Sequence, residues 1–153
     1  MERNEVLDYA AGLAMSQPGG ALATTHAELG APYITYVLAH LSRDGRLLFG
    51  SGLARQHSKN ILAHPAVSFL FDSRAAVATD WSGFDRLTIE GLARIVPKAS
   101  LEYETLLGEL GSKSPMAAYF TRHGELFCVE PRRIMLSRGL DPTRHVVEFP
   151  AHP

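Results

Sequence analysis

Several features that would assign a function class at once are missing from this sequence. The 153 residues contain one cysteine, Cys128, so no disulfide can form within the chain. No apolar run reaches the roughly 18 residues that a membrane-spanning helix needs. The N-terminal residues also lack the basic-then-apolar layout of a signal peptide. We therefore expect a cytoplasmic protein with no membrane partner.

An excess of charge of one sign is missing as well. The chain has 15 basic and 16 acidic side chains and a formal net charge of −1, so it has no field that would attract nucleic acid. Its content of 46% hydrophobic and 20% charged residues is typical of a globular protein that buries a core. No internal repeat and no flexible linker divides the sequence. We expect one domain over residues 1–153.

Motifs that mark common enzymes do not occur either. Neither GxGxxG, GxxxxGK[ST] nor GxSxG is present. Cys128 lies in the apolar run LFCV, which predicts a small buried residue and not an activated thiolate. The histidines include no i, i+4 pair and no HExxH, so we predict no metal site. A single histidine suffices as an axial ligand of haem, so haem binding stays open. No residue stands out as catalytic.

The spacing of apolar residues predicts four helices. They cover residues 3–15, 54–63, 98–110 and a short segment with Pro115 in its first turn. Ser100 is the expected N-cap of the third helix. Pro65 ends the second helix, because the residue before a proline avoids the helical region.

Runs rich in β-branched and aromatic residues predict five or six strands. They cover residues 21–26, 33–41, 47–51, 66–72, 86–96 and a last strand or pair of strands within 125–140. Asp44-Gly45 suits a hairpin turn, Gly91 suits a bulge or a close contact, and Pro131 suits an edge or a bulge. Residues 73–85 are the expected loop. Hairpin-linked strands with helices around them predict a mainly β (α+β) fold, a small antiparallel barrel with helical flanks.

The segment GSGLARQHSKNILAHP, residues 50–65, gathers charge at the start of the second predicted helix. The N-terminus of a helix offers unpaired backbone N–H groups and the positive end of its dipole, which together suit an anion. Arg55, His57 and Lys59 would reinforce such a site, and Ser51 could donate a hydroxyl hydrogen bond. His57 lies on the apolar face and is expected to point inward. The alternative interpretation is a solvated helix face.

The order of these segments carries a family resemblance. GGALATTH, YITYVLAHLSRDGRLLFGS, LARQHSKNILAHP, AVSFLFD and DRLTIEGLARIV follow one another as in the FMN-binding split barrels of the pyridoxamine 5′-phosphate oxidase-like superfamily, which they resemble over roughly residues 20–97. The chain is most similar to the HugZ-type haem-utilisation branch, whose helix has the form LAxHxxN before a His-Pro or Asp-Pro turn. The matching residues here are Leu53, Ala54, His57, Asn60 and His64-Pro65.

This resemblance implies a homodimer of six-stranded split barrels with flavin sites at the subunit interface. The phosphate of FMN would lie by the helix start, where Gly50 and Ser51 match the family's backbone and hydroxyl positions. The family grips the phosphate with an Arg-Lys pair, and Gln56 and His57 stand at those places. His57 could donate a hydrogen bond there, and Arg55 or Lys59 could supply charge.

The resemblance also implies how the flavin ring would be held. The strand around Thr35, Tyr36 and Val37 matches the strand whose backbone runs along the edge of the isoalloxazine. Arg86 falls where the oxidase has a glutamine near the ring, and an arginine there could stabilise negative charge on a reduced flavin. The alternative for Arg86 is a surface salt bridge with Asp85 or Asp80.

The function that these features imply is that of an FMN-binding flavoprotein, an oxidoreductase acting on an unidentified small molecule. Oxidation of vitamin B6 is disfavoured, because the C-terminal basic motif of true pyridoxamine phosphate oxidases is missing. One alternative is a haem-binding or haem-degrading split barrel that uses a histidine as axial ligand, with His145 and His152 near the C-terminus. Another is a non-enzymatic split barrel without cofactor, which the loss of the basic pair favours.

Overall fold

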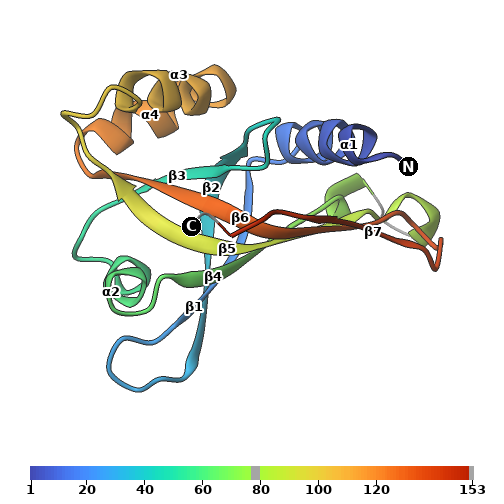
Figure 1. The fold of residues 1–153 in the computed structure, drawn as a ribbon, viewed down its shortest axis with the longest axis horizontal. Coiled ribbons are helices and arrows are strands. Elements are labelled where there is room, and N and C mark those ends of the chain that lie inside the picture. The colour runs from blue at the N-terminus through green and yellow to red at the C-terminus, as the bar shows by residue number, and fades with distance from the viewer. Residues whose placement is uncertain (77–79, 152–153) are drawn as a thin grey trace.

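The computed structural model of the chain describes residues 1–76 and 80–151 (Figure 1). The helices are α1 (Arg3–Met15), α2 (Gln56–Ala63), α3 (Tyr103–Lys113) and α4 (Pro115–Arg122), with two short 3-10 helices, η1 (Arg74–Ala76) and η2 (Trp81–Gly83). The strands are β1 (Gly19–Thr25), β2 (Pro32–Leu41), β3 (Leu47–Ser51), β4 (Ala66–Asp72), β5 (Arg86–Val96), β6 (Glu125–Ser137) and β7 (Arg144–Glu148).

Six of the strands close into a barrel. The order is β3-β2-β1-β4-β5-β6, every neighbouring pair is antiparallel, and β3 pairs with β6 to close the ring. The predicted mainly β (α+β) fold, a six-stranded antiparallel barrel with helical flanks, is confirmed. A seventh strand, β7, was not predicted; it pairs with Arg133–Ser137 at the end of β6.

The ladder between β2 and β3 is short, and this opens the barrel on one side. β2 pairs with β1 from Pro32 to Leu38, but it pairs with β3 only through Ala39, His40 and Leu41. Strand β3 pairs with β6 along its whole length, so beyond Phe49 it keeps only this neighbour and leads into the turn before α2. Among the residues that the structure describes, no strand therefore lies beside the edge of β2 from Pro32 to Leu38 that faces away from β1.

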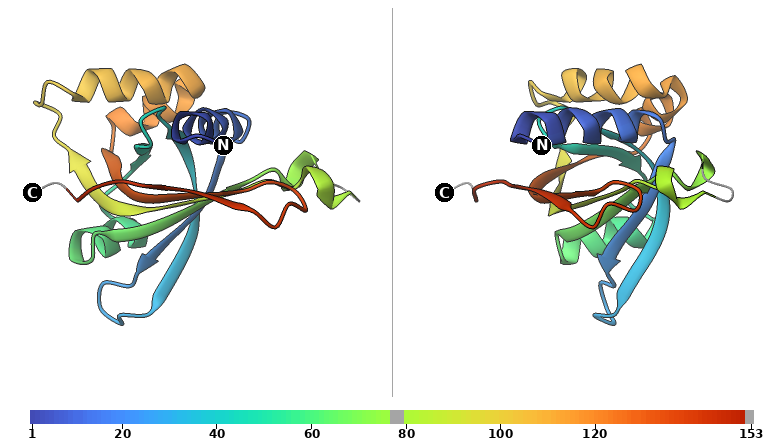
Figure 2. Two further views of the ribbon diagram at one scale, coloured as in Figure 1. Left: turned by 45° about the vertical axis from the view of Figure 1, so that its right-hand side comes forward. Right: turned by 90° about the vertical axis from the view of Figure 1, so that its right-hand side faces the viewer.

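Alternating apolar side chains fill the barrel interior, where Phe49, Phe69, Phe71 and Phe127 are fully buried. Phe49 and Phe127 stack with their ring centroids 5.2 Å apart. Helix α1 adds Val6, Ala10, Leu13 and Ala14 to this core, and α3 and α4 pack over the outer face of β3 and β6 in a second apolar cluster. Figure 2 shows α1 and the α3–α4 pair on the same side of the sheet, with α2 on the other.

Two predicted helix boundaries are wrong. Helix α3 begins at Tyr103 and not at residue 98, because the Ser100 N–H and hydroxyl both bond to the carbonyl of Pro97 and close a turn after β5. Glu102, not Ser100, is the N-cap. Helix α2 begins at Gln56, two residues later than predicted, after a turn.

The region predicted as a loop, 73–85, contains η1 and η2, and its residues 77–79 lie outside the described residues.

The predicted bulge is confirmed at Gly91 and Pro131. Glu90 pairs with Arg133 and Gly91 pairs with Pro131, so β6 has one extra residue at this point, Arg132. A Cβ atom on Gly91 would lie 2.2 Å from the carbonyl oxygen of Glu130. Only glycine fits here, because backbone atoms of the partner strand cannot move away cheaply.

We predict that Gly91→Ala destabilises the barrel by about 1–3 kcal/mol, since the added methyl group overpacks the β5–β6 ladder. Gly108→Ala is the matched control, because Gly108 lies within α3 and a methyl group added there would meet nothing within 4 Å. That change should stabilise the protein by about 0.5–1 kcal/mol. Urea denaturation measures both, and equal effects of the two variants would contradict this interpretation of the bulge.

Candidate cofactor site

A cavity of about 670 Å³ lies where β2, β3, α4 and the start of α2 meet. Its position follows from the short β2–β3 ladder, which leaves space beside the unpaired edge of β2. Eight of the nine predicted site residues line this cavity: Thr35, Tyr36 and Val37 from β2, Gly50 and Ser51 from β3, and Arg55, Gln56 and His57 at the start of α2. Segments that are separate in the sequence thus come together in one place.

The start of α2 forms one end of the cavity. Its N-cap, Arg55, has extended backbone torsions and makes no side-chain capping hydrogen bond. The first-turn N–H groups of a helix have no partner within the helix, so this end suits an acceptor or an anion from outside. Arg55 is exposed at the rim and adds a positive charge.

His57 and Ser51 form a hydrogen-bonded pair at the same end. The Ser51 Oγ lies 2.7 Å from the His57 Nε2, and the imidazole packs edge-on against the ring of Phe49. His57 is 8% exposed, which confirms that it points inward. Burial lowers the pKa of His57, and the charge of Arg55 lowers it further. The pair is therefore neutral near physiological pH, with hydrogen-bonding capacity but no fixed charge.

Helix α4 supplies a wall of the cavity that the sequence analysis did not identify. Ala117, Phe120 and Thr121 all line it. Thr121 sits so close to Gly50 that a Cβ on Gly50 would lie 1.9 Å from the Thr121 Oγ1. No local signal marks this contact, because it joins segments far apart in the sequence. Phe120 is exposed, which is consistent with a surface that contacts a ligand or a partner.

Arg86 is the one predicted site residue that lies elsewhere. It is the first residue of β5, is exposed, and places its guanidinium over the ring of Phe84 at 5.6 Å. In the described part of the chain no ion pair joins it to Asp85 or Asp80. Asp85 instead accepts hydrogen bonds from the hydroxyl of Tyr9 and the N–H of Gly139.

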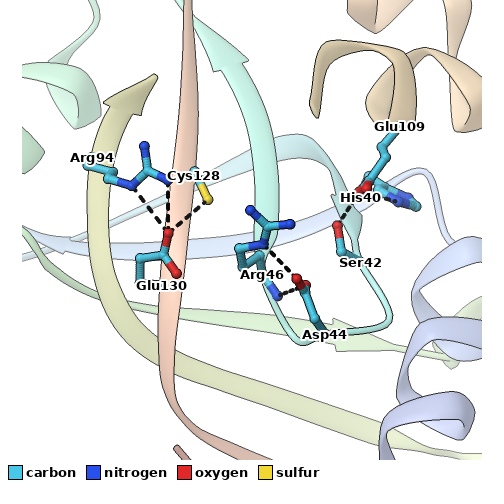
Figure 3. Close-up of polar contacts among 8 residues, drawn as sticks. All are labelled: His40, Ser42, Asp44, Arg46, Arg94, Glu109, Cys128 and Glu130. Carbon is cyan, nitrogen blue, oxygen red and sulfur yellow. Dashed lines mark hydrogen bonds and ion pairs between the residues drawn. The ribbon is translucent and has the colours of Figure 1, made fainter. Parts of the chain in front are cut away.

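Other polar side chains contact one another on the outer face of the barrel (Figure 3). The Arg94 guanidinium contacts the Glu130 carboxylate at 2.9 Å, and the Cys128 thiol lies 3.7 Å from the same carboxylate. Burial raises the pKa of Cys128 to about 12, so the thiol is buried and protonated, as predicted.

Glu109 of α3 accepts a hydrogen bond from Ser42 and lies 3.9 Å from His40. Among residues 1–76 and 80–151 no cluster of three metal-ligating side chains occurs.

The family model for pyridoxamine 5′-phosphate oxidase matches residues 9–137. The chain belongs to this family. The resemblance drawn from the order of the sequence segments is confirmed. A search of curated proteins found no match.

Solved structures of low sequence identity share the fold. A haem-binding protein from Mycobacterium smegmatis matches with a TM-score of 0.80 and 18% identity over 97% of this chain and 60% of its own length. The haem storage protein HutZ from Vibrio cholerae matches with a TM-score of 0.69 and 18% identity, covering 86% of this chain and 93% of HutZ. The general stress protein 26 from Bacillus anthracis matches with a TM-score of 0.66 and 15% identity, over 95% of this chain and 99% of its own. In the described part of the chain, no helix is long and apolar enough to cross a membrane.

The buried histidines predict a loss of stability in mild acid. Burial lowers the pKa values of His57 and His40 below the ordinary value of 6.5. As pH falls through about 6.5, the unfolded chain binds protons that the folded chain does not, so the free energy of unfolding falls. Urea denaturation between about pH 7.5 and 5 should show this decline, and His57→Gln should reduce its slope. A free energy of unfolding that does not change over this pH range would contradict the lowered pKa values of His57 and His40.

Proposed function

We propose that the chain is an FMN-binding flavoprotein and an oxidoreductase that acts on a small molecule. The observation that carries the proposal is the cavity between β2, β3 and α2, which gathers eight of the nine residues expected to hold the flavin. The fit is chemical as well as spatial, since a helix start and hydrogen-bonding side chains lie at one end and an unpaired strand edge lies along the side. Bound FMN would supply the hydride or electron transfer.

The phosphate of FMN would lie at the start of α2. The residues at that end are Ser51, Arg55, Gln56 and His57. Backbone N–H groups of the first turn and the Ser51 hydroxyl would donate hydrogen bonds to phosphate oxygens. The family's basic pair is replaced by two neutral side chains, so this site would depend on directed hydrogen bonds, with Arg55 as the nearest charge.

The isoalloxazine ring would lie along β2. The backbone of Thr35, Tyr36 and Val37 belongs to the part of β2 that pairs with β1 alone. Backbone N–H and C=O groups on the other edge remain available to the polar edge of a flavin ring. Phe120 of α4 would help to exclude water from this region.

A second copy of the chain would complete the site. The outer face of β2 exposes a row of apolar side chains, Ile34 (70%), Tyr36 (60%) and Leu38 (43%), and such a row on a strand is a typical contact surface. It is continuous with the cavity, because Tyr36 and Leu38 also line the cavity. Arg86 does not line the cavity of its own chain, so its predicted contact with the flavin requires a second copy. We therefore propose a homodimer.

Haem is the second candidate ligand. Two of the similar structures are described as a haem-binding protein and a haem storage protein, which favours this alternative over other cofactors. A histidine that serves as the axial ligand needs a free ring nitrogen. His57 is buried and bonded to Ser51, whereas His64 is exposed beside α2. A cofactor-free binding domain is the remaining alternative, and a protein that takes up neither ligand would support it.

We predict that Ser51→Ala weakens FMN binding about 10- to 100-fold, the effect of losing a hydrogen bond to a charged group. Riboflavin, which lacks the phosphate, should bind this variant as it binds the wild-type protein. Ser112→Ala on the far helix α3 is the matched control and should change neither affinity. Flavin fluorescence titration measures both ligands. If the protein does not bind FMN but gives a Soret band when haemin is added, its ligand is haem and not FMN.

The proposed dimer gives a separate prediction. Ile34→Asp places a charge in the apolar row on β2 and should yield a monomer, because an unpaired charge is costly to bury in an interface. Leu101→Asp, at an exposed leucine in the turn before α3, is the control and should leave the dimer intact. Light scattering after size exclusion gives both masses. A monomeric wild-type protein would refute the dimer.

A further inference from the structure

The side-chain amide of Asn60 links three segments beside the cavity. Asn60 lies on α2, one turn after Gln56, and is 0% exposed. Its Oδ1 accepts hydrogen bonds from the backbone N–H of Ala27 at 2.8 Å and from the Gln56 Nε2 at 2.8 Å. Its Nδ2 donates to the Thr24 Oγ1 at 2.9 Å. One buried amide therefore ties β1 and the β1–β2 loop to the start of α2.

These contacts determine which way the Asn60 amide faces. A backbone N–H can only donate, so the Asn60 atom that faces Ala27 must be the carbonyl oxygen. The amide nitrogen then faces Thr24, whose hydroxyl oxygen can accept. An Asn60 turned the other way would place two donors against each other at Ala27. The orientation thus follows from the chemistry of the partners and does not depend on telling oxygen from nitrogen by position.

The contact with Asn60 also determines which way the Gln56 amide faces. Because Oδ1 of Asn60 is an acceptor, the Gln56 atom in contact with it must be the amide nitrogen. A turned Gln56 would set its carbonyl oxygen against that of Asn60. Gln56 therefore keeps one orientation, and its amide nitrogen has a second N–H that Asn60 does not use. Gln56 is the first residue of α2 and lines the cavity.

We propose that Asn60 is a positioning residue that holds the Gln56 amide as a hydrogen-bond donor, and so determines the preference of the cavity for a phosphorylated flavin over an unphosphorylated one. This inference rests on the proposed function. The orientation matters because Gln56 replaces a basic residue of the family. A Lys or Arg side chain donates in every orientation, whereas an amide can present either a donor or a repelling carbonyl oxygen to an anion. Asn60 acts through Gln56 and does not line the cavity.

The test uses the ratio of the riboflavin and FMN dissociation constants, which isolates the contribution of the phosphate. In fluorescence titrations, Gln56→Ala should lower this ratio about tenfold, and Asn60→Ala should lower it several-fold. The double variant should lower it no further than Gln56→Ala alone, because Asn60 acts through that residue. Thr24→Val is the control: it removes a partner of Asn60 but leaves the contact with Ala27, so the ratio should stay while the melting temperature falls.

Two results would overturn this inference alone while the wild-type protein still prefers FMN. One is an Asn60→Ala variant that weakens FMN and riboflavin equally, which is the result of a purely structural role. The other is a double variant whose effect is the product of the two single effects. A wild-type ratio near one would overturn the proposed phosphate site as well, so the two failures are distinguishable.

A second measurement needs no variant and covers the case in which Asn60→Ala does not fold. One Gln56 side-chain amide proton and the Ala27 backbone proton are donated to the same oxygen atom, so these two protons should lie close enough to give a nuclear Overhauser effect in the wild-type protein. Observing it supports the fixed orientation of Gln56. A well-resolved spectrum without it overturns the inference.

Discussion

The early end of the β2–β3 ladder is the constraint on which the rest of the structure depends. Only three residue pairs join β2 and β3, whereas β3 pairs with β6 through all five of its residues, so β2 separates from β3 beyond Phe49. That divergence leaves one edge of β2 unpaired, opens the cavity, and directs the chain through Gly50–Gly52 into α2. Helix α4 forms one wall of the cavity. It can approach β3 because Gly50 has no side chain and leaves room for Thr121. The open strand edge, the helix start and the cavity therefore all follow from the short pairing of β2 with β3.

Much of the barrel could be predicted because its signals are local. Alternating apolar residues and turn residues placed β2 to β5 within one residue of their observed limits, and Gly91 and Pro131 marked the bulge. β7 was missed because its five residues, between polar and proline-containing turns, gain their order from β6. The start of α3 was misplaced because Ser100 has the sequence signature of a cap but closes a turn with Pro97.

In the candidate site, too, some features could be predicted from the sequence and others depend on contacts between distant segments. Sequence order and family resemblance named eight residues that line one cavity, although no spacing in the sequence shows that β2 and α2 meet. The wall from α4 and the buried bonds of Asn60 could not be predicted, since each depends on contacts between segments far apart in the sequence. Arg86 was expected near the ring, but as the first residue of β5 it does not line this cavity. In the proposed phosphate site, the neutral pair Gln56 and His57 would make hydrogen-bond direction, more than charge, the basis of selectivity.

The most direct test of the account is a crystal structure of the protein grown with FMN. The account predicts the phosphate within hydrogen-bonding distance of Ser51 and the first turn of α2, with the isoalloxazine along Thr35 to Val37 and a second chain against the outer face of β2. FMN bound at another surface, or a cavity filled by side chains from a second copy, would contradict it.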